Sequence, residues 1–244
     1  MQQNQSILKK PTNELQFPFF DRPLLATIIA MATGSMDGFT YITAGQFATV
    51  LSGNVIIFSY GIGINDPKKW LHPLFSILVF GCGAALTAIF THFANKSRKT
   101  HYWSHWVICA EIILLLLCGS NTLQNYLETW QIALIISFIA GMQGNAFHQL
   151  ENYHYGNVAI TNLVQSTFNY LFLGLLESRS NLRTCRLYLQ VLTGFAIGGF
   201  FGAYSAKHFL LGRHTLWFTA ALLFCLLIGS YLSKKRHPNE QIND

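Results

Sequence analysis

The chain has 244 residues, of which 51% are hydrophobic and only 11% charged, and its formal net charge is +6. Soluble domains carry about 25% charged residues, so these few charges cannot cover a water-exposed surface. The composition therefore predicts an integral membrane protein in contact with a lipid bilayer. The basic residues lie mainly at the ends of apolar segments, which favours membrane topology, and we expect no nucleic-acid partner.

Polar residues dominate both ends of the chain. We expect cytoplasmic tails over 1–23 and 233–244, and a single transmembrane domain over 24–232. A helix needs about 20 residues to cross the hydrocarbon, and the third, seventh and eighth of eight apolar segments have this length. The eight segments are 24–42, 46–64, 71–93, 103–119, 130–150, 157–176, 187–206 and 214–232.

The predicted fold class is all-α, a polytopic helical membrane protein with 6–8 transmembrane segments. The first two segments, and the fifth and sixth, are joined by a few residues and contain polar groups. If both segments of each pair cross the membrane, the chain crosses eight times. If each pair forms one broken helix that crosses once, the chain crosses six times. With eight crossings, 11 Lys and Arg residues lie on the N-terminal side of the membrane and 5 on the other side. With six crossings, the numbers are 12 and 4. Both divisions place the two termini in the cytoplasm.

A weak internal repeat relates two halves, 24–120 and 130–232. An offset of 108 residues aligns Asp37 with Asn145 and Asn54 with Asn162. Chance similarity is the alternative. Transporter folds are often built from such repeats, with the site between them. Four crossings in each half would make the repeats parallel, whereas three would make them inverted.

The stretch 34–54 interrupts the first apolar run with a carboxylate, several glycines and an amide. Asp37 follows Leu24 by 13 residues, which places it about 20 Å along a helix. Irregular backbone at membrane depth survives only where protein or water covers it, and an ionisable residue there indicates a functional site. Asp37 is thus a candidate proton or cation site. The alternative is a structural hydrogen bond to neighbouring helix ends.

Other polar residues within the apolar segments could contact a small molecule or an ion. Glu111 is a second intramembrane carboxylate, for which a proton relay and a helix-packing contact are the two interpretations. The remaining amides and hydroxyls could equally form hydrogen bonds between helices. With Asp37 and Glu111, the candidate binding residues are Ser52, Asn54, Gln143, Asn145, Thr161 and Asn162.

Glycines recur at four-residue spacing, which lets helices approach closely. We expect packing at these positions, with formation of a homo-oligomer as an alternative. No nucleophile–base pair and no three-ligand metal pattern is visible, so we expect neither an enzyme, a cofactor nor a metal site. The packing glycines are Gly34, Gly38, Gly81, Gly194, Gly198 and Gly202.

The motif GSMDGFTY at 34–41, followed by Ser-Gly-Asn at 52–54, resembles the YoaK-type family of bacterial inner-membrane proteins. The second half departs from the family pattern, since 161–163 reads Thr-Asn-Leu where the family has Thr-Gly-Thr. The resemblance covers about 20–235 and implies a multi-pass protein of the bacterial inner membrane without an established activity.

Two functions remain open at this stage. The leading hypothesis is a transporter or channel-like carrier of a small solute, with proton coupling through Asp37 as one form of it. Its basis is the combination of broken helices with intramembrane carboxylates. The alternative is a membrane scaffold or assembly protein that transports nothing, which the glycine-rich faces favour.

Overall fold

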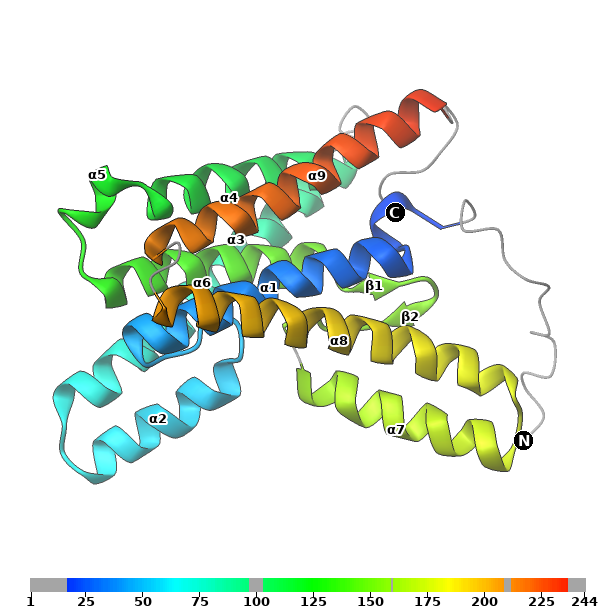
Figure 1. Ribbon diagram of the computed structural model, residues 1–244, viewed down its shortest axis with the longest axis horizontal. Helices are drawn as coiled ribbons and strands as arrows, with labels where there is room; N and C mark the ends of the chain where they lie inside the picture. Colours follow the sequence, from blue (N-terminus) through cyan, green and yellow to red (C-terminus); the bar gives the residue numbers. More distant parts are fainter. Residues whose placement is uncertain (1–16, 97–102, 159, 209–211, 237–244) are drawn as a thin grey trace.

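The computed structural model describes residues 17–96, 103–158, 160–208 and 212–236; the outer parts of both predicted tails lie outside these residues. The fold is all-α, as predicted, apart from one short hairpin (Figure 1). The long helices are α1 (Pro23–Ala44), α3 (Pro67–Lys96), α4 (Trp103–Gly119), α6 (Thr129–Ala146), α8 (Ser180–Lys207) and α9 (Thr215–Arg236). The shorter elements are η2 (Phe19–Asp21), α2 (Leu51–Gly63), α5 (Asn121–Gln124), β1 (Gln149–Leu150), β2 (Tyr153–His154), α7 (Ile160–Leu176) and η3 (Gly212–His214).

The long helices alternate in direction. In Figure 1, α1, α4 and α8 run from right to left, whereas α3, α6 and α9 run from left to right. Helix α1 packs against α8 and α3 packs against α6, and each of these pairs is parallel. Helices α4 and α9 are antiparallel, with Trp217 near Leu116 and Ser230 near His105. The first helix of each half thus packs on the third helix of the other half.

Glycines bring the paired helices close together. A Cβ atom added to Gly198 or Gly202 would overlap backbone of α1, at Met31 and Ser35 respectively. Gly34, Gly38 and Gly194 lie at the same α1–α8 contact. These five predicted packing glycines therefore bring together two helices of the same chain. The packing role predicted for Gly81 is wrong, because a Cβ atom there would meet nothing within 4 Å. The equivalent contact on α3 is made by Gly83, against Phe138 of α6.

Two short helices start inside the molecule and not at one of its ends. Helix α2 has 13 residues and α7 has 17, and Figure 1 shows both starting near the centre and running to opposite ends. The predicted second segment began at residue 46, but 46–50 is not helical. The reason is Gly45, which ends α1 in the left-handed conformation with φ of 65° while its N–H donates to Tyr41 O at 3.1 Å.

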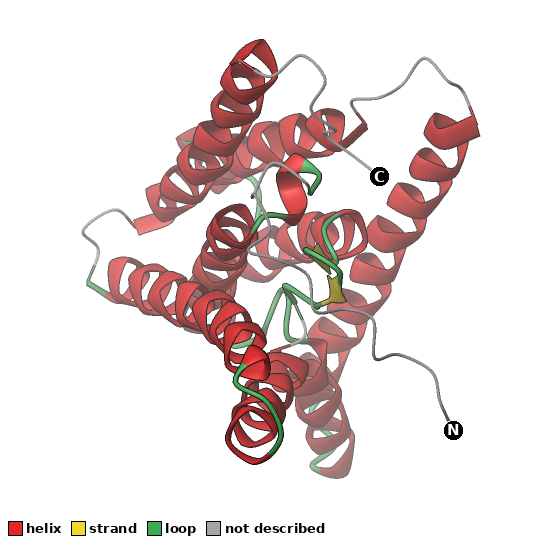
Figure 2. Cartoon of the chain, turned by 90° about the vertical axis from the view of Figure 1, so that its right-hand side faces the viewer, coloured by secondary structure: helices red, strands yellow, loops and turns green. Residues whose placement is uncertain are grey.

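The fifth predicted segment also ends early. It was expected to run to residue 150, whereas α6 stops at Ala146 and the chain forms the hairpin β1–β2. In this antiparallel hairpin Gln149 lies opposite His154 and Leu150 opposite Tyr153. Figure 2 views the molecule from the end where α1 begins, and the hairpin lies there among the helices. A break therefore follows the first helix of each half.

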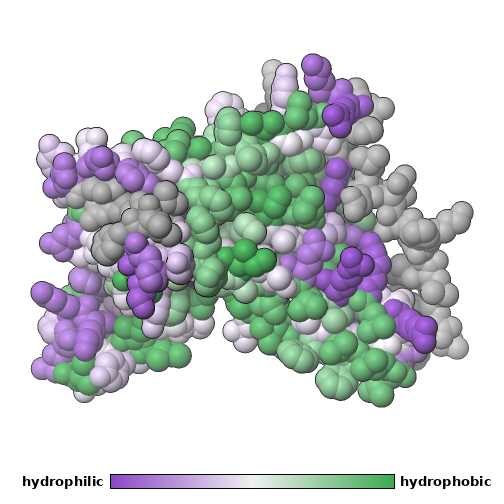
Figure 3. All heavy atoms as spheres, in the orientation of Figure 1, coloured by the Kyte–Doolittle hydropathy of each residue, from purple (hydrophilic) through white to green (hydrophobic). Residues whose placement is uncertain are grey.

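The hydropathy of the surface residues changes along the long axis of the molecule. On the face shown in Figure 3, hydrophobic residues cover the middle and hydrophilic residues gather towards the two ends. Among the described residues, helices α3, α8 and α9 are long and apolar enough to cross a membrane, and they correspond to the three predicted segments of full crossing length. The core between the helices is apolar, with Ile29, Met36 and Ile136 fully buried. Both features are those of a helical membrane protein.

Candidate functional site

Asp37 holds the break between α1 and α2. Its side chain is 5% exposed, and its Oδ1 accepts hydrogen bonds from the backbone N–H groups of Ala48 (3.0 Å) and Thr49 (2.8 Å). Its Oδ2 accepts from the Thr49 hydroxyl at 2.6 Å. An amide at the start of a helix needs an acceptor outside that helix. Asp37 supplies one for the turn that leads into α2, which is the structural interpretation of this residue.

Asn54 holds the same turn from its other side. Its Oδ1 accepts from Phe47 N at 2.9 Å, and its Nδ2 donates to Phe47 O at 2.5 Å and to Ser76 Oγ at 3.0 Å. The hydroxyls of Ser76 on α3 and Ser137 on α6 are 2.7 Å apart. Because both polar ends of Asn54 are used, this amide ties the turn to α3 and, through the two serines, to α6.

A second buried cluster joins α1, α6 and α4. Thr33 donates from its hydroxyl to Gln143 Oε1 at 2.7 Å, and Gln143 Nε2 donates to Glu111 Oε2 at 3.3 Å. All three side chains are fully buried. The other carboxyl oxygen of Glu111 has no hydrogen-bond partner among the described residues. Glu111 therefore retains one acceptor site for a proton, a water molecule or a solute.

The break in the second half is held differently. Asn145, aligned with Asp37, donates to Ala84 O on α3 at 3.2 Å instead of reaching the following loop. The loop itself is fastened at Glu151, whose carboxylate pairs with Arg183 of α8 at 2.7 Å and whose N–H donates to Asp21 O at 2.8 Å. Asn157 Nδ2 donates to Gln143 O at 3.4 Å. The second loop is thus covered by the hairpin and η2.

The predicted site residues do not form one cluster. Asp37 and Asn54 clamp the run 47–49 together, and Gln143 and Glu111 are directly bonded, so four of the eight belong to two buried groups. Asn145 is half-buried at the α6–α3 contact. Three of the predicted residues are exposed on the described chain and belong to neither group: Ser52, Thr161 and Asn162.

Several members of these groups were missed in the sequence. Thr33, Thr49, Ser76 and Ser137 are buried hydroxyls within apolar runs, where a serine or threonine is common and signals nothing by itself. Asn157 had a usable signal, because it lies at the 108-residue offset from Thr49. Thr49 lies in the loop before α2, and Asn157 lies in the loop before α7.

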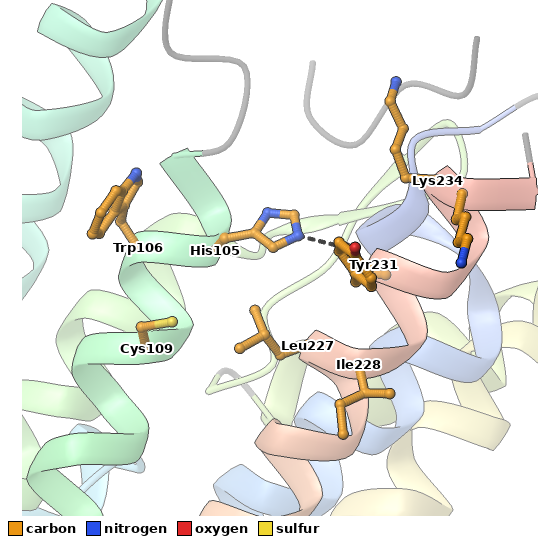
Figure 4. Close-up of a pocket in the computed structure, with 9 residues that line it drawn as sticks. His105, Trp106, Cys109, Leu227, Ile228, Tyr231 and Lys234 are labelled. Carbon is orange, nitrogen blue, oxygen red and sulfur yellow. Dashed lines mark hydrogen bonds between the residues drawn. The ribbon is translucent and has the colours of Figure 1, made fainter. Parts of the chain in front are cut away.

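Two cavities open at different places on the molecule. One of about 680 Å³ lies beside the first break, between the end of α1, α2 and the start of α3. The other, of about 790 Å³, lies between α4 and α9 (Figure 4). It is lined mainly by apolar side chains, and His105 and Ser230 form a 2.6 Å hydrogen bond at its wall. Only the first cavity adjoins the clamped turn.

Metal binding has no obvious place in this arrangement. Within the part of the chain that the structure describes, no group of three His, Cys, Asp or Glu side chains lies close enough to share an ion. The polar clusters consist of amides, hydroxyls and single carboxylates. Such groups can hydrogen-bond a solute or bind a proton.

Comparison with known proteins identifies the family of the chain but no activity. No curated protein and no solved structure matches the chain. One family model matches residues 25–229, which include both halves and both breaks, and its description is "Protein of unknown function (DUF1275)". The resemblance to the YoaK-type family, expected from the motif at 34–41, is consistent with this match. The chain therefore belongs to the DUF1275 family.

Proposed function

We propose that this protein is a membrane carrier for a small polar solute, built from two inverted halves that each cross the membrane three times. The observation that carries the proposal is the pair of short helices that follow the two breaks, α2 and α7. Both begin near the centre of the molecule after a non-helical loop, and they run towards opposite ends (Figure 1). Broken helices that meet near the middle of a membrane are how many secondary transporters form their solute sites.

The direction of the helices supports six crossings. Helices α1, α3, α4, α6, α8 and α9 would cross, while α2 and α7 would return to the side from which their loops entered. This arrangement corresponds to the 12 against 4 division of basic residues, from which we infer that both termini lie in the cytoplasm of a bacterium. The first cavity then opens on the opposite, external side.

Within this proposal the two carboxylates have different roles. Asp37 accepts three hydrogen bonds from the turn, so its role is to hold the loop in place. Glu111 has an oxygen without a partner among the described residues and is connected through Gln143 to α1. We therefore assign proton coupling, if the carrier uses it, to Glu111. Carboxylates within membrane segments are among the groups that form proton relays in transporters.

The scaffold alternative loses its main support. It was based on glycine-rich faces available for a partner, but Gly34, Gly194, Gly198 and Gly202 lie at the contact between α1 and α8 of the same chain. A scaffold also has no need of loops that turn back inside the molecule. Irregular backbone of this kind is tolerated where it lines a cavity.

Reconstitution into liposomes tests the proposal. Purified protein would be screened with carboxylates, amines, amino acids and sugars, while solute uptake and internal pH are recorded. We expect saturable uptake of at least one class of solute, absent from protein-free liposomes. Glu111→Gln should abolish any accompanying pH change, whereas Ser52→Ala, an exposed control, should leave uptake unchanged. No uptake of any solute by folded protein, together with a stable co-purifying partner, would support the scaffold instead.

A further inference from the structure

A buried amide without a partner lies at the wall of the first cavity. Gln46 is 1% exposed, and neither its Nε2 nor its Oε1 has a hydrogen-bond partner among the described residues. Burying an amide without a hydrogen-bond partner is unfavourable. Gln46 lies in the loop that Asp37 and Asn54 hold in place, next to Gly45. A rotation of the Gln46 side chain would therefore present an unpaired donor and an unpaired acceptor to a molecule that occupies the cavity.

The charge of the cavity is positive. Its lining includes Lys68 and Lys69 from the start of α3 and contains no Asp or Glu among the described residues. Lys69 lies 3.7 Å from Asp66, just outside the cavity, and its ammonium group is 5.7 Å from the centre of the Tyr60 ring. Lys68 has no ion pair within the described chain. Both lysines are exposed, so they can attract an anion without themselves being desolvated.

The rest of the wall is apolar or aromatic. Tyr41 and Tyr60 line the cavity, and the Tyr41 ring stacks on Phe47 at 4.9 Å between centroids. Ile57 and Pro73 also contribute to the lining. A volume of about 680 Å³ lies within the range of small-molecule sites, which combine apolar walls with a few placed polar groups.

From these observations we infer that the cavity binds a small organic carboxylate with an apolar body. The carboxylate accepts a hydrogen bond from Gln46 Nε2 and is attracted by Lys68 and Lys69, while the body contacts the aromatic and aliphatic wall. The inference deepens the proposed function. The role of the cavity as the external entry site rests on that function. Binding itself does not require transport and is measured on detergent-solubilised protein.

Benzoate and benzamide form a matched pair of probes, since they share a shape and differ in charge. Thermal unfolding of the full chain in detergent would be followed at increasing concentrations of each. We expect benzoate to raise the melting temperature of the wild type clearly more than benzamide does. Loss of a hydrogen bond to a charged group weakens binding about tenfold or more, so Gln46→Leu should raise the apparent Kd for benzoate by that factor.

Control variants separate the site from general effects of charge. Lys68→Gln should weaken benzoate binding severalfold, and the loss should be smaller at high salt. Lys235→Gln removes an exposed charge from the far end of α9 and should not change the affinity. Gln46→Leu should melt no earlier than the wild type in the absence of benzoate, because the amide has no partner to lose among the described residues.

The inference is overturned if benzoate and benzamide give equal shifts, or if Gln46→Leu binds benzoate like the wild type. Equal losses of affinity in Lys68→Gln and Lys235→Gln would overturn it as well. Its failure differs from failure of the carrier proposal. Benzoate binding that depends on Gln46, in a protein that transports nothing, would support the site and refute the carrier.

Discussion

Replacing Asp37 separates a role as an acceptor of hydrogen bonds from a role as a charge. In Asp37→Ala the backbone N–H groups of Ala48 and Thr49, both buried, lose their acceptor. Each stranded donor costs about 1–3 kcal/mol, so we expect a loss of about 2–6 kcal/mol in the free energy of unfolding. The Thr49 hydroxyl can rotate to another acceptor and adds little to this sum.

Asp37→Asn should be much milder. The amide oxygen can accept from both N–H groups, and the new NH₂ can donate to the Thr49 hydroxyl oxygen. Only the extra strength of bonds to an ionised group is lost, and we expect a cost of about 1–2 kcal/mol. Solute uptake should persist in this variant, because the turn keeps its position and proton coupling is assigned to Glu111.

Unfolding with sodium dodecyl sulfate in mixed micelles, followed by circular dichroism, gives the required free energies. Ser52→Ala is the control, since Ser52 is exposed in the first turn of α2 and its replacement should change stability by less than about 0.5 kcal/mol. The reasoning is refuted if Asp37→Ala lies within about 1 kcal/mol of the wild type. It is also refuted if Asp37→Asn is as damaging as Asp37→Ala, because the charge itself would then be essential.

Three further predictions follow from helix packing, the buried clusters and the proposed topology. Gly83→Ala should destabilise the protein by about 1–3 kcal/mol through overpacking, whereas Gly81→Ala should not destabilise it; equal melting temperatures would contradict the assigned contact. Gln143→Leu should cost about 1–3 kcal/mol by stranding polar partners, and Glu111→Leu in that background should recover part of the loss in a double-mutant cycle. A periplasmic alkaline phosphatase reporter fused after Asn65 should be active; an inactive fusion would favour eight crossings.

Much of the architecture could be predicted from residue patterns. Helices α3, α8 and α9 were expected at nearly the observed positions, because a long apolar run has few alternatives to a helix. The breaks in the two halves were also expected, between the first and second and between the fifth and sixth apolar segments, although their bounds differed from those observed. Their internal geometry was not predictable, because the acceptor for Ala48 N lies on another helix, 11 residues earlier in the chain.

The candidate site was only partly predictable for a similar reason. Asp37 and Glu111 are conspicuous as carboxylates in apolar segments, but whether such a group is satisfied depends on its neighbours in space. Asp37 is satisfied by the turn, whereas one oxygen of Glu111 has no partner among the described residues. Gln46 was overlooked because it begins an apolar segment, and only the packed structure shows that its amide is buried and unpaired.

The central claim is that the break between α1 and α2 lies inside the membrane and can be reached by solutes from the external side. Tyr41→Cys, at an exposed position that lines the first cavity, would be introduced after replacement of the five native cysteines. A charged, membrane-impermeant thiol reagent would then be added to intact spheroplasts or to inverted vesicles. The account predicts labelling from the external side of spheroplasts and none in inverted vesicles. Labelling only in inverted vesicles, or from neither side, would contradict it.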